Sequence, residues 1–159
     1  MAGVGGEAVP VPHLPGARVL VVEARYYPHI NNMLLAGARA VLDAAGAVAD
    51  HAVVPGALEI PPAIALAHRS GPFDAFVALG CVIRGETTHY DLVAGDSCRG
   101  ITDLGVREGA LIGNGILTVE NEGQALSRAD PAIQDKGGGA ARAALILLAL
   151  RRRFGAGAG

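Results

Sequence analysis

Residues 18–54, RVLVVEARYYPHINNMLLAGARAVLDAAGAVADHAVV, contain the pattern that decides the fold. The run Arg18–Ala24 is almost continuously apolar, as expected of a strand that is buried on both faces. Apolar residues then recur at spacings of three and four from Ile30 to Ala45, which predicts an amphipathic helix closed by Gly46. A second strand is expected over Val48–Val54. Strand, helix and strand in this order predict parallel strands joined by a right-handed crossover.

The alternation continues along the rest of the chain. Further strands are predicted over 74–80 and within 110–119, and further helices over 61–69, 88–109, 122–129 and 138–154. These elements predict an α/β protein: a three-layer α/β/α sandwich with a four-stranded parallel sheet, flavodoxin-like in plan. Residues 1–15 are expected to form a flexible N-terminal arm, 16–154 a single domain and 155–159 a frayed tail.

Composition excludes several classes of protein. The 159 residues are 51% hydrophobic and 18% charged, which is not the composition of a disordered chain. Thirteen Lys and Arg against 15 Asp and Glu provide no basic excess for nucleic acid. No apolar run approaches the ~18 residues that a membrane span needs. The two cysteines have no metal-site spacing and form no disulfide framework, so we expect no metal and a reducing, cytoplasmic setting.

The carboxyl ends of the strands are the place to look for a ligand, because open parallel sheets bind ligands there. Four loops meet at that edge: Arg25–Pro28, Pro55–Glu59, Cys81–His89 and Glu120–Glu122. In the third, a turn at Gly85 leads into a helix near Thr88, and the N–H groups of a helix start bind phosphate well. His89 would place a proton carrier beside that phosphate. The alternative is that Thr87 or Thr88 only caps the helix and His89 is a partly exposed helix residue.

Other polar features leave two interpretations open. Glu59 either accepts hydrogen bonds from substrate hydroxyls or favourably charges a helix N-terminus. The rings of Tyr26 and Tyr27 either stack on a planar heterocycle or pack within the protein. Gly137–Gly139 is either a phosphate-binding nest or a flexible hinge before the last helix.

Four motifs in register resemble the 6,7-dimethyl-8-ribityllumazine synthase family over about residues 18–154. They are VPGALEIP (54–61), GCVIRGETTHYD (80–91), GNGILTVEN (113–121) and DKG (135–137). The resemblance implies condensation of 5-amino-6-(D-ribitylamino)uracil with 3,4-dihydroxy-2-butanone 4-phosphate, with loss of phosphate and water. This is the penultimate step of riboflavin biosynthesis, it has no redox step and it needs no cofactor. The alternatives are a non-catalytic flavin- or lumazine-binding shell protein of the same fold, and a generic phosphate- or nucleotide-binding module.

The resemblance also implies roles for individual residues. His89, Arg128 and Lys136 match the catalytic positions, and His89 is the proton shuttle. The phosphate-binding positions are Gly85, Glu86, Thr87, Thr88 and Arg128. The remaining substrate-binding positions are Tyr26, Tyr27, Gly56, Ala57, Leu58, Glu59, Cys81, Val82, Ile83 and Asn114. Tyr27, Leu58 and Asn114 depart from the family pattern, which commonly has Asn, Phe and Phe there.

The family implies partners as well. Its active site lies between neighbouring subunits, so Asn114, Arg128 and Lys136 are expected to come from the adjacent chain. The expected assembly is a homopentamer. The short segment 129–136, followed by three glycines that would let the last helix pivot, favours twelve pentamers in a 60-subunit icosahedral shell. Riboflavin synthase is a further candidate partner.

Overall fold

The parallel sheet predicted from the sequence is present in the computed structural model, which describes residues 7–156. Residues 1–6 of the expected arm and 157–159 of the expected tail lie outside the described range. Four strands pair in the order β2-β1-β3-β4, all parallel. They are β1 (Arg18–Ala24), β2 (Val48–Val54), β3 (Ala75–Ile83) and β4 (Ile112–Val119).

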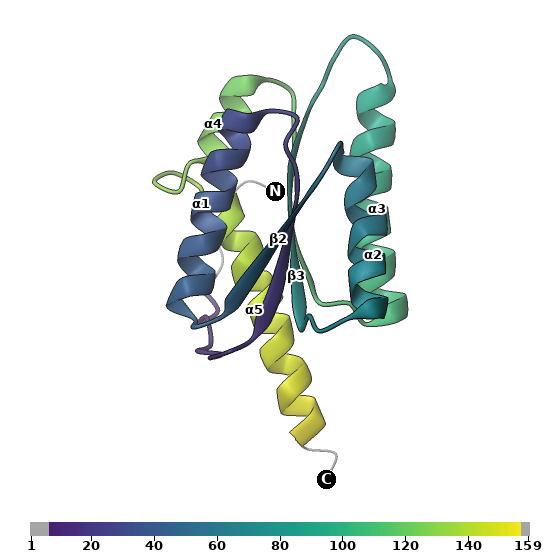
Figure 1. Ribbon diagram of the computed structural model, residues 1–159. Helices are drawn as coiled ribbons and strands as arrows, with labels where there is room; N and C mark the ends of the chain where they lie inside the picture. The colour runs from purple at the N-terminus through teal and green to yellow at the C-terminus, as the bar shows by residue number, and fades with distance from the viewer. Residues whose placement is uncertain (1–6, 157–159) are drawn as a thin grey trace.

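Helices cover both faces of this sheet, which confirms the three-layer sandwich (Figure 1). On one face lie α1 (Pro28–Ala44), α4 (Glu122–Ala129) and α5 (Lys136–Ala156). On the other lie α2 (Ile60–Ser70), which follows the short 3-10 helix η1 (Ala57–Glu59), and α3 (His89–Glu108). Among residues 7–156, no helix is long and apolar enough to cross a bilayer.

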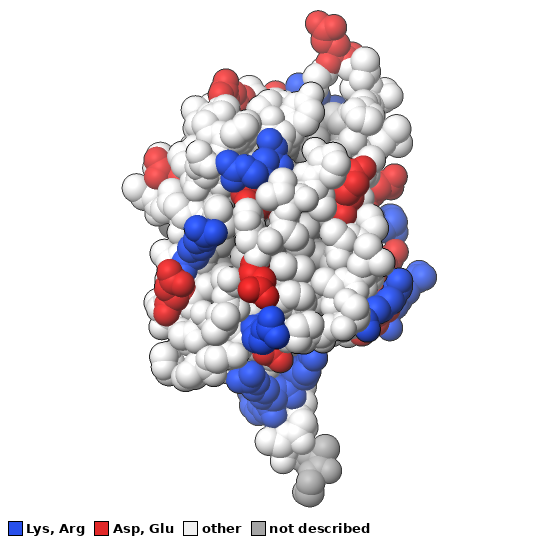
Figure 2. Space-filling model, in the orientation of Figure 1, with Lys and Arg blue, Asp and Glu red and all other residues white. Residues whose placement is uncertain are grey.

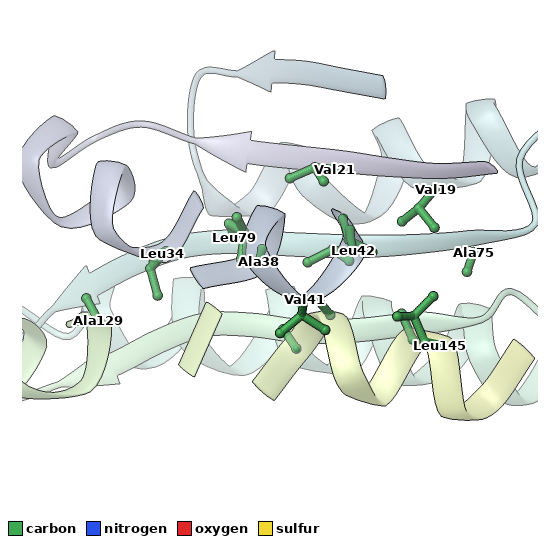
Figure 3. Packing of buried hydrophobic residues seen from close by; sticks show 14 of the residues in the cluster. Val19, Val21, Leu34, Ala38, Val41, Leu42, Ala75, Leu79, Ala129 and Leu145 are labelled. Atoms are coloured by element: carbon green, nitrogen blue, oxygen red, sulfur yellow. The ribbon is translucent and has the colours of Figure 1, made fainter. Parts of the chain in front are cut away.

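Two apolar cores fill the spaces between the layers. Figure 3 shows the core beneath α1 and α5, where Val19 and Val21 of β1 face Leu34 and Leu42 of α1. The opposite face of β1, with Leu20 and Val22, packs into the second core beneath α2 and α3. Alternate residues of one strand therefore enter different cores, which explains why the β1 sequence is apolar throughout.

Strand β3 ends three residues later than the sequence predicted. Cys81, Val82 and Ile83 pair with Leu117, Thr118 and Val119 of β4. The sequence pattern predicts a loop over Cys81–His89, which includes these apolar residues. Cross-strand pairing extends the strand, so their backbone is held rigidly at the edge where ligands were expected.

The glycine triplet is neither a hinge nor a nest, because α5 begins at Lys136 and Gly137–Gly139 lie inside its first turn. A Cβ on Gly137 would lie 2.0 Å from the carbonyl oxygen of Leu34 in α1, so this glycine permits direct contact between the two helix backbones. Asp135 precedes the helix at φ 47°, and its Oδ1 accepts a 3.0 Å hydrogen bond from the Gly138 N–H. The predicted pivoting of the last helix is therefore wrong, since close packing and a side-chain cap hold the helix start.

The two ends of the described chain differ in how they meet the rest of the domain. Residues 7–14 form no helix or strand, but Leu14 is buried and its N–H donates to the Ala45 carbonyl at 2.8 Å. At the other end, α5 continues to Ala156, beyond the limit expected at Phe154. This end projects past the sheet, and the Lys and Arg side chains in Figure 2 gather around it, whereas other charged groups are scattered.

Candidate active site

A cleft of about 540 Å³ opens at the carboxyl ends of β1, β2 and β3. Three of the four loops predicted to meet at this edge contribute to its walls. The lining residues are Ala24, Tyr26, Tyr27, Pro55, Gly56, Ala57, Leu58, Glu59, Cys81, Val82, Ile83, Gly85, Thr87, His89, Tyr90 and Val93. The walls are thus largely apolar, with a few polar groups, as in a site that binds a small molecule.

One wall is the turn between β2 and α2. Residues 57–59 form the 3-10 helix η1, and the Glu59 N–H donates to the Gly56 carbonyl at 3.1 Å. A Cβ on Gly56 would lie 3.0 Å from Glu59 Oε2, so the glycine leaves room for the carboxylate to fold back over the turn. Glu59 is exposed and has no side-chain hydrogen bond within residues 7–156. Its oxygens are therefore available to hydroxyl donors.

A second part of the wall carries two tyrosines that follow β1. Their rings lie edge to face with centroids 5.0 Å apart, and Tyr26 is 73% exposed. Burial, with smaller contributions from Cys81 and Tyr26, raises the pKa of Tyr27, so its hydroxyl stays protonated at neutral pH. An exposed ring braced by a second ring can stack on a planar ligand.

The floor is the end of β3. Cys81 is 5% exposed, and burial raises the pKa of its thiol from 9.0 to about 11. The thiol is therefore protonated at neutral pH and is a poor nucleophile. Val82 and Ile83 continue the floor as half-buried apolar side chains on the paired strand.

Beyond the floor, the loop of residues 84–88 leads into α3, which begins at His89. The Thr87 hydroxyl accepts a 3.3 Å hydrogen bond from the His89 N–H, and Thr88 occupies the cap position without a side-chain bond. Thr88 is therefore the N-cap by position, but neither threonine makes a side-chain bond to the second or third helical N–H. The His89 ring lines the cleft and makes no side-chain hydrogen bond within residues 7–156. Both ring nitrogens are available to a ligand.

Arg84 fixes the start of this loop. Its Nε donates to Glu120 Oε2 at 2.8 Å, its Nη1 lies 3.3 Å from Asp91 Oδ1, and its guanidinium lies 4.2 Å from the centroid of the Tyr90 ring. The hydrogen bond to Glu120 raises the pKa of Arg84. Arg84 therefore joins the ends of β3 and β4 to the first turn of α3.

The structure gathers twelve of the predicted site residues in the cleft and leaves five outside it. Glu86 and Thr88 belong to the same loop but do not line the cleft. Asn114 lies on β4, where its side chain contacts Cys98 Sγ at 3.6 Å. Arg128 turns back on α4 and donates to the Gln124 carbonyl at 3.1 Å. Lys136 is exposed at the start of α5.

Four lining residues were not predicted: Ala24, Pro55, Tyr90 and Val93. Tyr90 had a usable signal, because aromatic residues are only 4% of the chain and this one adjoins His89. Val93 lies one helical turn after His89, so it shares that face of α3. Ala24 and Pro55 line the cleft because they end β1 and follow β2, which only the strand bounds reveal.

Comparisons with known proteins agree with one another. Residues 16–152 match the family model described as 6,7-dimethyl-8-ribityllumazine synthase. A protein of that name from Erythrobacter litoralis is 63% identical over 140 residues, 88% of this chain and 99% of the relative. Its namesake from Sphingopyxis alaskensis is 61% identical over 141 residues, 89% of this chain and 99% of the relative. One from Novosphingobium aromaticivorans is 62% identical over 138 residues, again 99% of the relative.

Proposed function

The chain belongs to the 6,7-dimethyl-8-ribityllumazine synthase family, and from that premise we propose that it is a working synthase. It condenses 5-amino-6-(D-ribitylamino)uracil with 3,4-dihydroxy-2-butanone 4-phosphate. The amine condenses with the ketone with loss of one water, phosphate is eliminated, and the second nitrogen closes the ring on the remaining carbonyl with loss of a second water. The observation that carries the proposal is the single cleft in which Glu59, His89 and two tyrosine rings meet.

The uracil is held between the tyrosines and the η1 turn. Tyr26 stacks on the pyrimidine, Tyr27 braces that ring, and Val82 and Ile83 contact the heterocycle from the floor. The ribityl chain extends toward Glu59, whose unpartnered carboxylate accepts hydrogen bonds from its hydroxyls. The backbone of residues 56–58 lies beside the same chain.

The phosphorylated ketone lies at the start of α3. The loop residues Gly85 and Thr87 bind its phosphate at the N-terminus of α3, assisted by the positive end of the helix dipole. His89 adjoins this position and moves protons during condensation and phosphate loss. Cys81 does not attack the substrate, because its thiol keeps its proton at neutral pH.

A neighbouring copy of the chain completes the site. Asn114, Arg128 and Lys136 lie outside the cleft of their own chain, so a ring in which each copy supplies these residues to the next explains their placement. We propose a homopentamer. The 60-subunit shell was expected because the last helix could pivot, and the fixed start of α5 removes that reason for it. Sedimentation tests this: a mass of five chains excludes the shell, and a monomer at micromolar concentration excludes the shared site.

The test of function is direct. The protein is mixed with both substrates, and the lumazine is followed by its absorbance and fluorescence, with the reaction without protein subtracted. Product formation above this background, lost in Glu59→Gln together with uracil affinity, is the expected result. A protein that binds lumazine or riboflavin but yields no product above background would instead be the non-catalytic binding protein.

A further inference from the structure

A buried carboxylate lies directly behind the tyrosine wall of the cleft. Glu23 is fully buried in β1, where every neighbour in the strand from Val19 to Ala24 is apolar. The residue after it, Ala24, lines the cleft, but Glu23 does not. A carboxylate at such a position is costly unless it is paired and hydrogen bonded. Nothing in the proposed chemistry uses Glu23 directly.

Its partners come from three different parts of the chain. Glu23 Oε1 accepts from Arg25 Nη1 at 3.0 Å and from Asn31 Nδ2 of α1 at 3.2 Å. Oε2 contacts the His51 Nε2 of β2. One carboxylate therefore joins the end of β1 to the edge strand β2 and to the first turns of α1.

Arg25 connects Glu23 to the segment that joins β1 to α1. Its Nη2 donates to the Pro28 carbonyl at 3.4 Å and to the Asn32 side chain, so the guanidinium bridges Glu23 and the start of α1. Tyr26 and Tyr27 lie between these two attachment points, and both line the cleft. The position of the tyrosine rings therefore depends on the Glu23–Arg25 pair.

We propose that Glu23 is a positioning residue that sets affinity for the planar, nitrogen-containing substrate by holding Arg25, and through it the Tyr26–Tyr27 turn. The inference rests on the proposed function in one respect, namely that these rings contact the uracil. Glu23 touches neither substrate, and none of its side-chain partners, Arg25, Asn31 and His51, belongs to the loop that is assigned to phosphate.

Steady-state kinetics of Glu23→Gln and Arg25→Gln test this. The amide keeps the shape, and its oxygen can still accept from Arg25 and Asn31, but it loses the charge that strengthens the Arg25 contact. We expect KM for the uracil to rise about fivefold to tenfold in each variant, with kcat and KM for the ketone phosphate within about twofold. Because both residues act through one contact, KM for the uracil in the double variant should not exceed the higher of the two single-variant values.

A matched control separates this role from general stabilisation. Arg18 and Asp50 form a second acid–base pair between β1 and β2, at 3.0 Å, near the opposite end of β1. Asp50→Asn makes the same acid-to-amide change in the same strand pair, and it should leave both KM values unchanged. Additive effects of Glu23→Gln and Arg25→Gln, or equal rises in both KM values, would overturn the inference. If Glu23→Gln does not fold, Arg25→Gln alone gives the same test, because its side chain is 27% exposed.

Binding can be measured without turnover. The chain has no Trp, and all three of its tyrosines, Tyr26, Tyr27 and Tyr90, line the cleft. Tyrosine fluorescence therefore reports on this site alone, and titration with the uracil should quench it at about fivefold to tenfold higher concentration in Glu23→Gln than in wild type. A wild type that binds the uracil and makes no lumazine would refute the proposed function but not this inference. A wild type that makes lumazine, with unchanged binding in both variants, would refute the inference alone.

Discussion

The two faces of the sheet are packed differently. Seven of the 21 residues of α5 are buried, but only three of the 20 residues of α3 are. Two of those three, Ile101 and Leu104, lie in the half of α3 that is remote from the cleft, and Ser97 lies near the middle of the helix. Large apolar side chains also remain exposed on the α2–α3 face, where Leu66 is 70%, Leu92 60% and Val106 82% exposed.

The difference indicates that one face mainly stabilises the fold and the other mainly provides the cleft and a surface for contacts. On the α1–α5 face, helix backbones contact each other and the sheet directly through glycines, which fixes the fold. On the α2–α3 face, the cleft end of α3 is held mainly by the polar contacts of Arg84, and apolar surface is left over. A surface of that kind suits contact with a further copy of the chain. The predictions below test whether stability and function separate in this way.

The largest effect is expected on the densely packed face. In Gly137→Ala, the new methyl group would lie 2.0 Å from the Leu34 carbonyl oxygen, a backbone atom that cannot move aside without shifting α1. We expect a loss of ~3 kcal/mol or more in the free energy of unfolding, measured by chemical denaturation. Gly139→Ala is the control, because a Cβ there has no neighbour within 4 Å. Equal stability of the two variants would contradict the close packing of α5 on α1.

The next largest effect is expected on the open face, in activity and not in stability. His89→Ala removes the proposed proton carrier and should lower the catalysed rate by ~10²–10⁴-fold, after subtraction of the unaided reaction. Unfolding should be unchanged, because His89 is exposed at the start of α3. His29→Ala is the control: His29 pairs with Glu122 at 2.7 Å but does not line the cleft. A near-normal rate in His89→Ala would remove this residue from the mechanism.

Arg128 is expected to affect function although it lies on the densely packed face. It belongs to α4, and we propose that it binds phosphate in the cleft of a neighbouring copy. Arg128→Gln should raise KM for the ketone phosphate by about tenfold or more and leave uracil binding unchanged, since a charge-assisted contact is lost. Equal losses for both substrates would argue against a phosphate partner.

Mixed assemblies test which chain supplies Arg128. In rings formed from equal amounts of Arg128→Gln and His89→Ala, about a quarter of shared sites combine two intact halves. Activity near that fraction of wild type is therefore expected, whereas each variant alone stays low. No recovery in demonstrably mixed rings would mean that His89 and Arg128 act within the same chain.

Much of this organisation was predictable from the sequence. The bounds of β1 and β2 agree with the prediction, because glycine or proline interrupts the pattern next to each apolar run. The cleft was predictable from strand order alone, since the carboxyl ends of parallel strands share one edge. That rule brought Tyr26, Glu59 and His89 together, although they lie far apart in the chain.

The rest depends on pairing that the sequence does not display. Cys81–Ile83 read equally well as loop or strand until β4 pairs with them. Gly137 read as a hinge, because its neighbour Leu34 lies about a hundred residues earlier in the chain. The sequence assigns Glu23 only to an almost continuously apolar strand, and its partner His51 becomes evident from the pairing of β1 with β2.

The smallest expected effect lies where the packed face meets the cleft, at Cys81. This residue belongs to the core beneath α1 and α5 and also lines the cleft floor, so its thiol reports how far the dry interior extends. Burial raises its pKa from 9.0 to about 11, so the folded protein keeps the thiol proton in a pH range where the unfolded chain loses it. The contribution of this thiol to the free energy of unfolding is therefore constant below pH 9. It falls as pH rises from 9 to about 11, because only the unfolded chain loses the proton there. In Cys98→Ala, which leaves one thiol, alkylation of Cys81 should be slow at pH 8 and accelerate only toward pH 11, whereas in denaturant it should accelerate near pH 9. Fast labelling of the folded protein at pH 8 would show that water reaches the floor of the cleft and that the packed face ends short of it.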